Sequence, residues 1–340
     1  MKRREAFSID LAGAVDMTHG AGGRAMAGLI EALFARHFDN EYLRQGNDQA
    51  AFAPPPGRLV MSTDGHVVSP LFFPGGDIGS LAVHGTINDV AMAGARPLFL
   101  SAAFVLEAGF PLADLDRIAA SMAGASRAAG VPIVTGDTKV VEKGKGDGVF
   151  ITTTGVGAVP DGVNISGERA QPGDAVLISG TIGDHGVAIL SKRENLEFET
   201  QIMSDSAALH ELVAAMVAVA PDIHCLRDPT RGGLAATLNE LAQQSCVGMR
   251  LNEAAIPVKP QVKGACELLG LDPLNVANEG KLVAICAPAD AATLLDAMRA
   301  LPLGTDAAII GEVVDDASGF VQMQTALGGW RMVDWLAGEQ

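Results

Sequence analysis

The chain has 340 residues, of which 48% are hydrophobic and 19% are charged, proportions typical of a globular protein with about two domains. Its formal net charge is −16 at pH 7 and its isoelectric point is about 4.7. This acidity argues against nonspecific binding to nucleic acids or anionic membranes, because both require a basic face.

Cysteine usage and hydropathy restrict the class of protein further. Cys225, Cys246, Cys266 and Cys286 show no CxxC spacing, so we expect buried, reduced thiols rather than a disulfide framework or a zinc site. No apolar region follows the basic start Met1-Lys2-Arg3-Arg4, and no apolar run is long enough to span a bilayer. We therefore expect a cytoplasmic protein.

A glycine-rich segment is the first candidate site along the chain. Thr18-His19-Gly20-Ala21-Gly22-Gly23 precedes apolar residues between Met26 and Phe34 that are spaced as on one face of a helix. Gly20, Gly22 and Gly23 would then open a helix, whose free N–H groups bind anions. Glycines also serve any tight turn, so both interpretations stay open.

Two carboxylates follow on the next predicted elements. Leu59 to Asp64 predicts a strand that ends in an aspartate, and the helix after Pro74-Gly75-Gly76 carries Asn88 and Asp89 among small apolar residues. Burial of Asp89 in such surroundings would be costly unless a cation or hydrogen bonds satisfied it. A helix cap or a solvent-facing position is the alternative.

A third carboxylate comes after a strand and an alanine-rich helix, predicted at 97–106 and 112–129. Val131 to Val134 is a short apolar run that predicts a buried strand, and Thr135-Gly136-Asp137-Thr138-Lys139 is predicted as the turn after it. Glycine allows close approach of the backbone, the carboxylate suits Mg²⁺, and the lysine offers a charge to a phosphate. An ordinary acidic turn is the alternative.

The middle of the chain contains the best candidate for a domain boundary. A β-branched strand is predicted at 149–159, and the turn-rich stretch from Pro160 to Asp174 is poor in apolar residues. We therefore predict an N-terminal domain of residues 1–163 and a C-terminal α/β domain of residues 164–340.

Polar motifs beside glycines recur in the second half. His185 in Gly183-Asp184-His185-Gly186 could be catalytic or could fix a turn. Thr230 and Arg231 stand at a glycine-rich helix start, an arrangement that suits an anion. Ala277-Asn278-Glu279-Gly280-Lys281 precedes a strand predicted at 282–286.

The inventory of Asp64, Asp89, Asp137 and Lys139 with a glycine loop is that of a nucleotide–Mg²⁺ site. No Walker motif, no GxGxxG after a strand and no kinase signature is present. Spacing alone therefore indicates a nucleotide site without identifying the reaction.

Seven motifs in a fixed order cover nearly the whole chain and together resemble the HypE family of hydrogenase maturation proteins. They are Thr18-His19-Gly20-Ala21-Gly22-Gly23, Ser62-Thr63-Asp64, Gly85-Thr86-Ile87-Asn88-Asp89-Val90-Ala91, Thr135-Gly136-Asp137-Thr138-Lys139-Val140, Gly183-Asp184-His185-Gly186, Asp228-Pro229-Thr230-Arg231-Gly232-Gly233 and Ala277-Asn278-Glu279-Gly280-Lys281-Leu282.

The resemblance implies an α/β (α+β) fold of the aminoimidazole ribonucleotide synthetase type. It has an N-terminal mixed sheet through which two copies dimerise, a C-terminal α/β sandwich, and ATP–Mg²⁺ near the dimer interface. The implied reaction is ATP-dependent dehydration of a C-terminal cysteine S-carboxamide to thiocyanate, which supplies cyanide ligands to nickel–iron hydrogenase. The implied partners are the carbamoyltransferase HypF and a HypC–HypD complex that accepts cyanide.

Site residues are carried over motif by motif. Lys139, Glu279 and His19 are the implied catalytic residues, with Glu279 preferred as the base and a turn-holding hydrogen bond as its alternative role. Asp64, Asp89 and Asp137 are the implied metal ligands. The implied ATP-binding residues are Gly20, Gly22, Gly23, Asp64, Asn88, Asp89, Thr135, Gly136, Asp137, Thr138, Lys139, Thr230, Arg231 and Asn278.

One departure affects the expected activity. The family ends in Pro-Arg-Ile-Cys, whereas this sequence ends in Gly338-Glu339-Gln340 and its four cysteines lie within predicted folded elements. As given, the chain is expected to bind ATP without completing the thiocyanate reaction. The alternatives are an ATP-binding scaffold without turnover and another enzyme of the superfamily, such as selenophosphate synthetase, which would place cysteine where Met17-Thr18-His19 stands.

Overall fold

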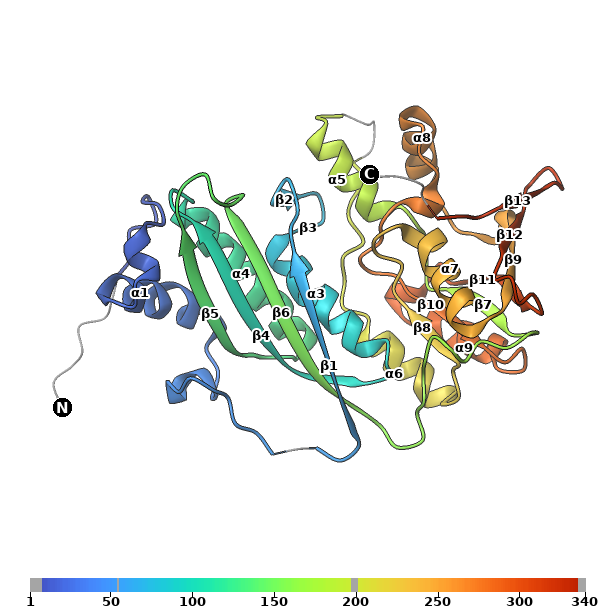
Figure 1. The fold of residues 1–340 in the computed structure, drawn as a ribbon, viewed down its shortest axis with the longest axis horizontal. Coiled ribbons are helices and arrows are strands. Elements are labelled where there is room, and N and C mark those ends of the chain that lie inside the picture. Colours follow the sequence, from blue (N-terminus) through green and yellow to red (C-terminus); the bar gives the residue numbers. More distant parts are fainter. Residues whose placement is uncertain (1–7, 54, 197–200, 336–340) are drawn as a thin grey trace.

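The N-terminal part of the computed structural model is a sheet with helices on one face (Figure 1). The model describes residues 8–53, 55–196 and 201–335. The four strands are ordered β1-β6-β4-β5, and only the β4–β5 pair is parallel. Their bounds are β1 Arg58–His66, β4 Arg96–Glu107, β5 Ile133–Val141 and β6 Val149–Val159, and the covering helices are α3 Ile78–Ala91 and α4 Leu112–Ala129.

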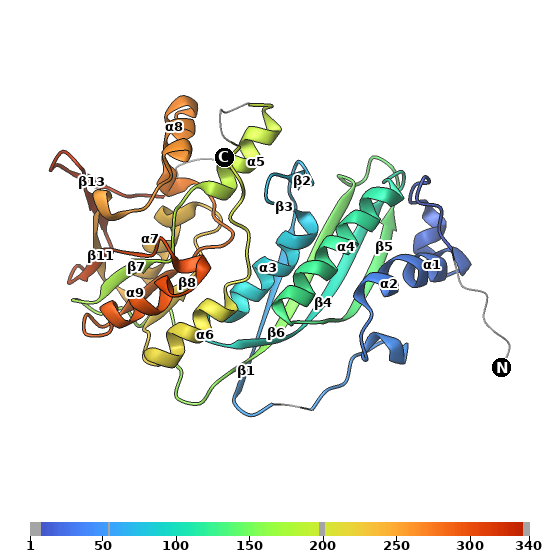
Figure 2. The ribbon, with the colours of Figure 1, turned by 180° about the vertical axis from the view of Figure 1, so that it is seen from behind.

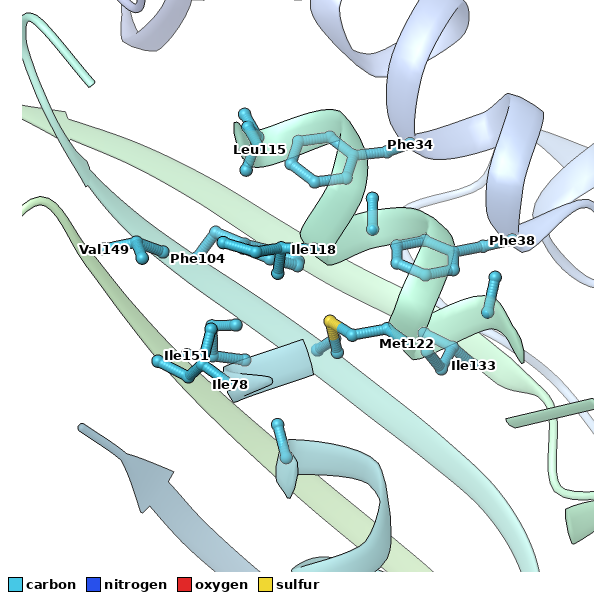
Figure 3. Close-up of a cluster of buried hydrophobic side chains, with 14 of the residues drawn as sticks. Phe34, Phe38, Ile78, Phe104, Leu115, Ile118, Met122, Ile133, Val149 and Ile151 are labelled. Carbon is cyan, nitrogen blue, oxygen red and sulfur yellow. The ribbon is translucent and has the colours of Figure 1, made fainter. Parts of the chain in front are cut away.

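One face of this sheet is buried and the other is open. Alternate residues of β4, including Leu100 and Phe104, pack with Ile118 and Met122 of α4 in the main core (Figure 3). Figure 2 shows α3 and α4 across this face, and Figure 1 looks onto the uncovered face. On the uncovered face Met61 of β1 is 72% exposed, so this face is available to a partner.

The predicted amphipathic helix near the N-terminus is confirmed, with an irregular centre. It forms as α1 Arg24–Leu29, the π-helical η2 Ile30–Phe34 and α2 Ala35–Phe38, which follow the 3₁₀ turn η1 Met17–Gly20. Its apolar residues Leu29, Leu33 and Phe34 are buried in the main core. The helix therefore covers the sheet beside β5, as expected from its spacing.

Two short stretches of the first half differ from the prediction. Thr135 to Lys139 does not form a turn, because these residues continue β5 in parallel pairing with β4. The strand predicted to end at Asp64 continues to His66 as β1, and a two-residue ribbon follows it, β2 Phe72–Phe73 with β3 Gly76–Asp77. The polar residues of β5 are tolerated in a strand because they lie at the edge of the sheet.

The C-terminal part is a seven-stranded sheet in the order β13-β12-β9-β11-β7-β10-β8. Two neighbouring strands of this sheet, β7 and β10, are buried along their whole length. The strands are β7 Ala175–Ile178, β8 Cys225–Arg227, β9 Gly248–Asn252, β10 Val283–Cys286, β11 Ala308–Val314, β12 Val321–Gln324 and β13 Trp330–Met332. The helices are α5 Asp184–Arg193, α6 His210–Val219, α7 Gly233–Ser245, α8 Pro260–Leu269 and α9 Ala291–Arg299. Short 3₁₀ turns lie at η4 Glu253–Ala255, η5 Pro273–Asn275 and η6 Pro302–Gly304, and a further one, η3 Leu43–Gln45, lies in the N-terminal part.

The two parts share an apolar cluster. Val90 of α3, Val163 and Ile165 pack in the same cluster as Leu212 and Met216 of α6. The residues between β6 and β7 form neither helix nor strand, which is consistent with a linker. The boundary between residues 163 and 164 stays a prediction.

Three of the four cysteines are buried as expected. Cys246 is exposed, which corrects the prediction for that residue. It follows α7 with a positive φ of 54°, a position at the end of a helix that faces solvent. Among the helices described, none is both long and apolar enough to cross a membrane.

Candidate active site

The carboxylates of Asp64 and Asp89 lie together between β1 and α3. Ser62 and Asp64 of β1 are on the face covered by α3, and Ser62 Oγ donates a hydrogen bond to Asp89 Oδ2 at 2.8 Å. Arg231, at the start of α7, brings Nη2 to 4.0 Å from Asp64 Oδ1. We call Asp64, Asp89, Asp228 and Glu279, with Arg231, the interdomain cluster.

The interdomain cluster collects negative charge in a poorly solvated place. Burial raises the pKa of Asp89, with a smaller contribution from the charge of Asp64. Burial, followed by the charge of Asp89, raises the pKa of Asp228 to about 7. Burial also raises the pKa of Glu279 well above its usual range, and Asp228 and Asp205 add to the effect. Such a cluster favours protons or a cation.

Oxygen donors of this kind suit a hard divalent cation. In the parts of the chain that the structure describes, no three His, Cys, Asp or Glu side chains are close enough together to hold a metal ion. Asp64, Asp89 and Asp228 lie close enough together for the charge of one to raise the pKa of another.

Asp137 lies on the other face and the other edge of the sheet. Asp137 is level with Ala103, between the buried residues Ala102 and Phe104, so it points away from the helices. β6 and β4 separate β1 from β5, which places the two edges about 14 Å apart. One chain therefore does not bring the three predicted metal ligands together.

Lys139 accompanies Asp137 on the open face. Its Nζ lies 3.2 Å from Asp137 Oδ2, and both side chains are more than half exposed. The glycine loop is next to this strand, because a Cβ at Gly20 would lie 2.9 Å from Val140 Cβ. We call Gly20, Gly22 and Gly23 with Asp137 and Lys139 the β5-edge cluster.

The remaining residues of these two N-terminal motifs have structural contacts. His19 Nδ1 accepts a hydrogen bond from the Asp16 N–H at 3.1 Å, within a capping box at the start of η1. Gly136 is needed for strand pairing, because a Cβ there would lie 2.2 Å from Ala102 O. Thr138 is buried and lies on the helix-covered face, whereas Thr135 is half-buried.

The side-chain amides of Asn88 and Asn278 form hydrogen bonds with backbone groups around the site. Asn88 Nδ2 donates to Ala207 O at 3.0 Å and to Glu279 O at 3.3 Å, and its Oδ1 accepts from the Leu209 N–H. Asn278 is entirely buried. These amides clamp backbone in this structure rather than present free groups to a nucleotide.

The start of α7 fits the predicted anion site. Gly232 and Gly233 have φ of 74° and 62°, which leaves the N–H groups of α7 without a capping side chain. Arg231 is 93% exposed, and Thr230 is half-buried beside it. The two residues that the sequence singled out here therefore stand at a helix N-terminus.

His185 is placed as a structural residue. It is buried, its Nδ1 lies 2.8 Å from Ser204 Oγ, and its ring meets Phe73 edge-on. Sequence reasoning gave no role to Asp228 or Asp205. Asp228 stood in a quoted motif, whereas Asp205 follows a polar stretch and carried no signal in the sequence.

Family models match both parts of the chain. The N-terminal domain of AIR synthase related proteins matches residues 46–159, and the C-terminal domain matches residues 171–324. The carbamoyl dehydratase HypE of Cupriavidus necator is 74% identical over 96% of this chain and 94% of its own length. The chain belongs to the HypE family.

HypE proteins of lower sequence identity also match this chain over most of its length. The carbamoyl dehydratase HypE of Escherichia coli is 48% identical over 88% of this chain and 91% of its own length. A crystal structure of hydrogenase maturation protein HypE in complex with ATP has a TM-score of 0.92 and 52% identity, covering 95% of this chain and 98% of its own. A HypE–HypF complex has a TM-score of 0.80 and 51% identity, covering 91% and 99%.

These comparisons confirm the family and the fold expected from the sequence. The function expected from the resemblance, carbamoyl dehydration in hydrogenase maturation, is confirmed at the level of the family. Thiamine-monophosphate kinase of Stenotrophomonas maltophilia, at 21% identity and a TM-score of 0.64 over 84% of this chain and 93% of its own, shares the fold alone.

Proposed function

We propose that this chain is the ATP-dependent carbamoyl dehydratase that converts a C-terminal cysteine S-carboxamide to a thiocyanate for the cyanide ligands of nickel–iron hydrogenase. The observation that carries the proposal is Glu279, a carboxylate with a raised pKa in the interdomain cluster. A base of raised pKa is suited to collect a proton near neutral pH. The ATP complex of a structural neighbour supports the use of ATP.

The chemistry requires one activation and a loss of protons. The γ-phosphoryl group of ATP is transferred to the amide oxygen, so that oxygen can leave as phosphate when the C–O bond breaks. The nitrogen loses two protons in total as the C≡N bond forms, and Glu279 would accept one of them. Lys139 would stabilise negative charge on the transferred group.

Mg²⁺ would neutralise the charge of the triphosphate, with Asp64 and Asp89 as its ligands and Asp137 supplied from elsewhere. Arg231 and the N-terminus of α7 would orient a phosphate. The carboxylate oxygens of the interdomain cluster are the donor type that a hard cation prefers. Thr230, at the same helix start, would contribute a hydroxyl.

We also propose that the enzyme works as a homodimer that pairs the open faces of the N-terminal sheets. Met61 and Leu59 expose apolar area on this face, and Asp137 and Lys139 project from it. A second copy that placed its β5 edge beside the β1 edge of this chain would bring its β5-edge cluster to the interdomain cluster. The dimer would thus complete the set of residues that one chain separates.

The carbamoyl group would come from HypF, as the HypE–HypF complex of a structural neighbour supports. A HypC–HypD complex would accept the cyanide. The expected cytoplasmic location stays a prediction. The end of the chain, Gly338-Glu339-Gln340, lies outside the described residues.

Intact-mass measurement tests the proposed reaction. The chain as given and a version extended with Pro-Arg-Ile-Cys are incubated with the carbamoyltransferase, carbamoyl phosphate, ATP and Mg²⁺. We expect the extended chain to gain a carbamoyl group and then to lose the mass of water. Glu279→Gln should stop at the carbamoylated form, whereas Glu267→Gln, at an exposed glutamate of α8, should proceed. Carbamoylation of the unmutated extended chain without dehydration would favour the ATP-binding scaffold instead.

A further inference from the structure

Asp205 contacts the loop that carries Glu279, and it lies in a segment outside the seven motifs quoted for the HypE family. It belongs to residues 201–209, which lead into α6 and run beside α3 in both ribbon views (Figure 1, Figure 2). Its side chain is only 3% exposed, and Oδ2 lies 3.3 Å from Lys281 Nζ. Its other oxygen, Oδ1, accepts a hydrogen bond from the Glu279 N–H at 3.0 Å.

Both parts of the molecule hold the segment that carries Asp205. The Ser204 N–H donates to Pro74 O at 2.8 Å, and the Leu209 N–H donates to Asn88 Oδ1 at 2.8 Å. From the C-terminal part, His185 Nδ1 lies 2.8 Å from Ser204 Oγ. Asp205 is therefore anchored independently of the loop that it contacts.

The loop leaves little space around this contact. A Cβ at Gly280 would lie 1.8 Å from Asp205 O, so glycine is what permits the two backbones to touch. The Ala207 N–H reaches Glu279 O at 3.4 Å. The stem of Lys281, which is 11% exposed, passes Gly180, where a Cβ would lie 3.0 Å from Lys281 Cε.

We infer that Asp205 is a positioning residue for Glu279, whose main chain it fixes, while Lys281 lies beside the Asp205 carboxylate as its ion-pair partner. The inference rests on the base role given to Glu279 under the proposed function. A carboxylate this deeply buried is retained only with a charged or hydrogen-bonded partner. Lys281 supplies the charge and the Glu279 N–H supplies the hydrogen bond. These two contacts fix the orientation of the Glu279 loop relative to residues 201–209.

Two variants separate the hydrogen bond from the charge. Asp205→Ala removes both, whereas Asp205→Asn keeps a carbonyl oxygen for the Glu279 N–H. Asp174→Ala is the matched control, because Asp174 is also buried, accepts the Gln171 N–H at 2.7 Å and lies 2.7 Å from His224 Nδ1. Asp174 lies away from Glu279, at the start of β7.

Hydrogen exchange followed by mass spectrometry tests the contact between Asp205 and the Glu279 N–H in the absence of turnover. The peptide spanning 276–282 should exchange at least about tenfold faster in Asp205→Ala. Asp205→Asn and Asp174→Ala should leave its exchange close to that of the unmutated chain. Unchanged exchange of this peptide in Asp205→Ala would overturn the inference.

The rate of dehydration, measured in the chain extended with Pro-Arg-Ile-Cys, tests whether this contact matters for catalysis. Asp205→Ala should lower the rate at saturating ATP by about 10- to 100-fold with little change in the ATP concentration at half-maximal rate. Asp205→Asn should restore most of it. Equal rates in Asp205→Ala and Asp174→Ala would overturn the positioning role. Full activity of Glu279→Gln would instead overturn the base role, and with it the catalytic purpose of the Asp205 contact.

Discussion

As the proposed base, Glu279 must lose its proton before it can act, yet its surroundings favour the protonated form. Burial is the main cause of its raised pKa, and the charges of Asp228, Asp205, Asp64 and Asp89 add to it. The limb of the pH–rate profile that reports this group should therefore lie above the usual range of a glutamate. Activity should rise with pH through that limb.

Replacing one of the neighbouring carboxylates should move this limb. Asp228→Asn removes the charge that contributes most after burial, so we expect the limb of kcat/KM to shift to lower pH. Asp222→Asn, at an exposed surface pair with Arg169, should leave the limb in place. Coincident profiles of Asp228→Asn and the unmutated chain would show that another group controls the limb.

Asn278 illustrates a second kind of site residue, one that supports the others. Its Oδ1 accepts from the Gly183 N–H at 2.8 Å, and its Nδ2 donates to Pro229 O and Val276 O at 2.9 and 3.0 Å. Three loops of the C-terminal part therefore meet on one amide. Its removal would leave a buried N–H without a partner.

Asn278→Ala should lower the free energy of unfolding by about 3 kcal/mol, because buried backbone groups lose their hydrogen bonds. The exposed Asn252, which accepts the Ala254 N–H at 3.1 Å, offers a matched control, and Asn252→Ala should cost about 1 kcal/mol. Urea unfolding followed by circular dichroism measures both. Equal losses in the two variants would contradict the clamp assigned to Asn278.

At the scale of elements, close packing of α3 on β6 places Asp89 in the site. Gly155 and Gly157 of β6 face this helix, and a Cβ at Gly155 would lie 2.9 Å from Thr86 Cγ2 and Val90 Cγ2. The glycines let the helix approach the sheet. The approach brings Asp89 within hydrogen-bonding distance of Ser62 on β1.

Gly157→Ala should therefore lower the free energy of unfolding by about 1 to 3 kcal/mol through overpacking. The added Cβ would lie 2.4 Å from Val90 Cγ1 and 2.9 Å from the backbone oxygen of Arg96. Gly124→Ala is the control, because it lies within α4 with no atom within 4 Å of the added Cβ, and it should stabilise by up to about 1 kcal/mol. Thermal unfolding distinguishes the two signs, and stabilisation by Gly157→Ala would refute the packing argument.

For the whole molecule, the proposed dimer depends on the open face of the N-terminal sheet. Its apolar side chains and the position of Lys139 on it support pairing with a second copy. Charge introduced on this face would have to be buried in the dimer, which is costly without a partner.

Met61→Glu should therefore weaken the dimer by at least about tenfold, or about 1.4 kcal/mol, and lower turnover in parallel. Leu268, on α8 and 73% exposed against 72% for Met61, provides a control of equal exposure, and Leu268→Glu should leave both unchanged. Sedimentation velocity measures the association. A dimer unaffected by Met61→Glu, or dissociated by Leu268→Glu, would place the interface elsewhere.

The sequence by itself determined the elements and the chemistry of the motifs. Periodicity predicted the strand at 149–159 and the helix at 112–129 with the bounds that the structure has, because hydrophobic spacing alone distinguishes a strand from a helix over such lengths. The motifs identified the family because they occur in one order along the chain.

Only the tertiary structure decided which of these residues meet. Asp137 and Asp64 look equivalent as aspartates beside strands, yet strand order and side-chain alternation put them on opposite edges and faces of one sheet. Asp205 reaches Glu279 across 74 positions of sequence, a distance over which local pattern carries no information. Long-range pairing depends on how whole elements pack, and it therefore decided both the separation of Asp137 from Asp64 and the contact between Asp205 and the loop of Glu279.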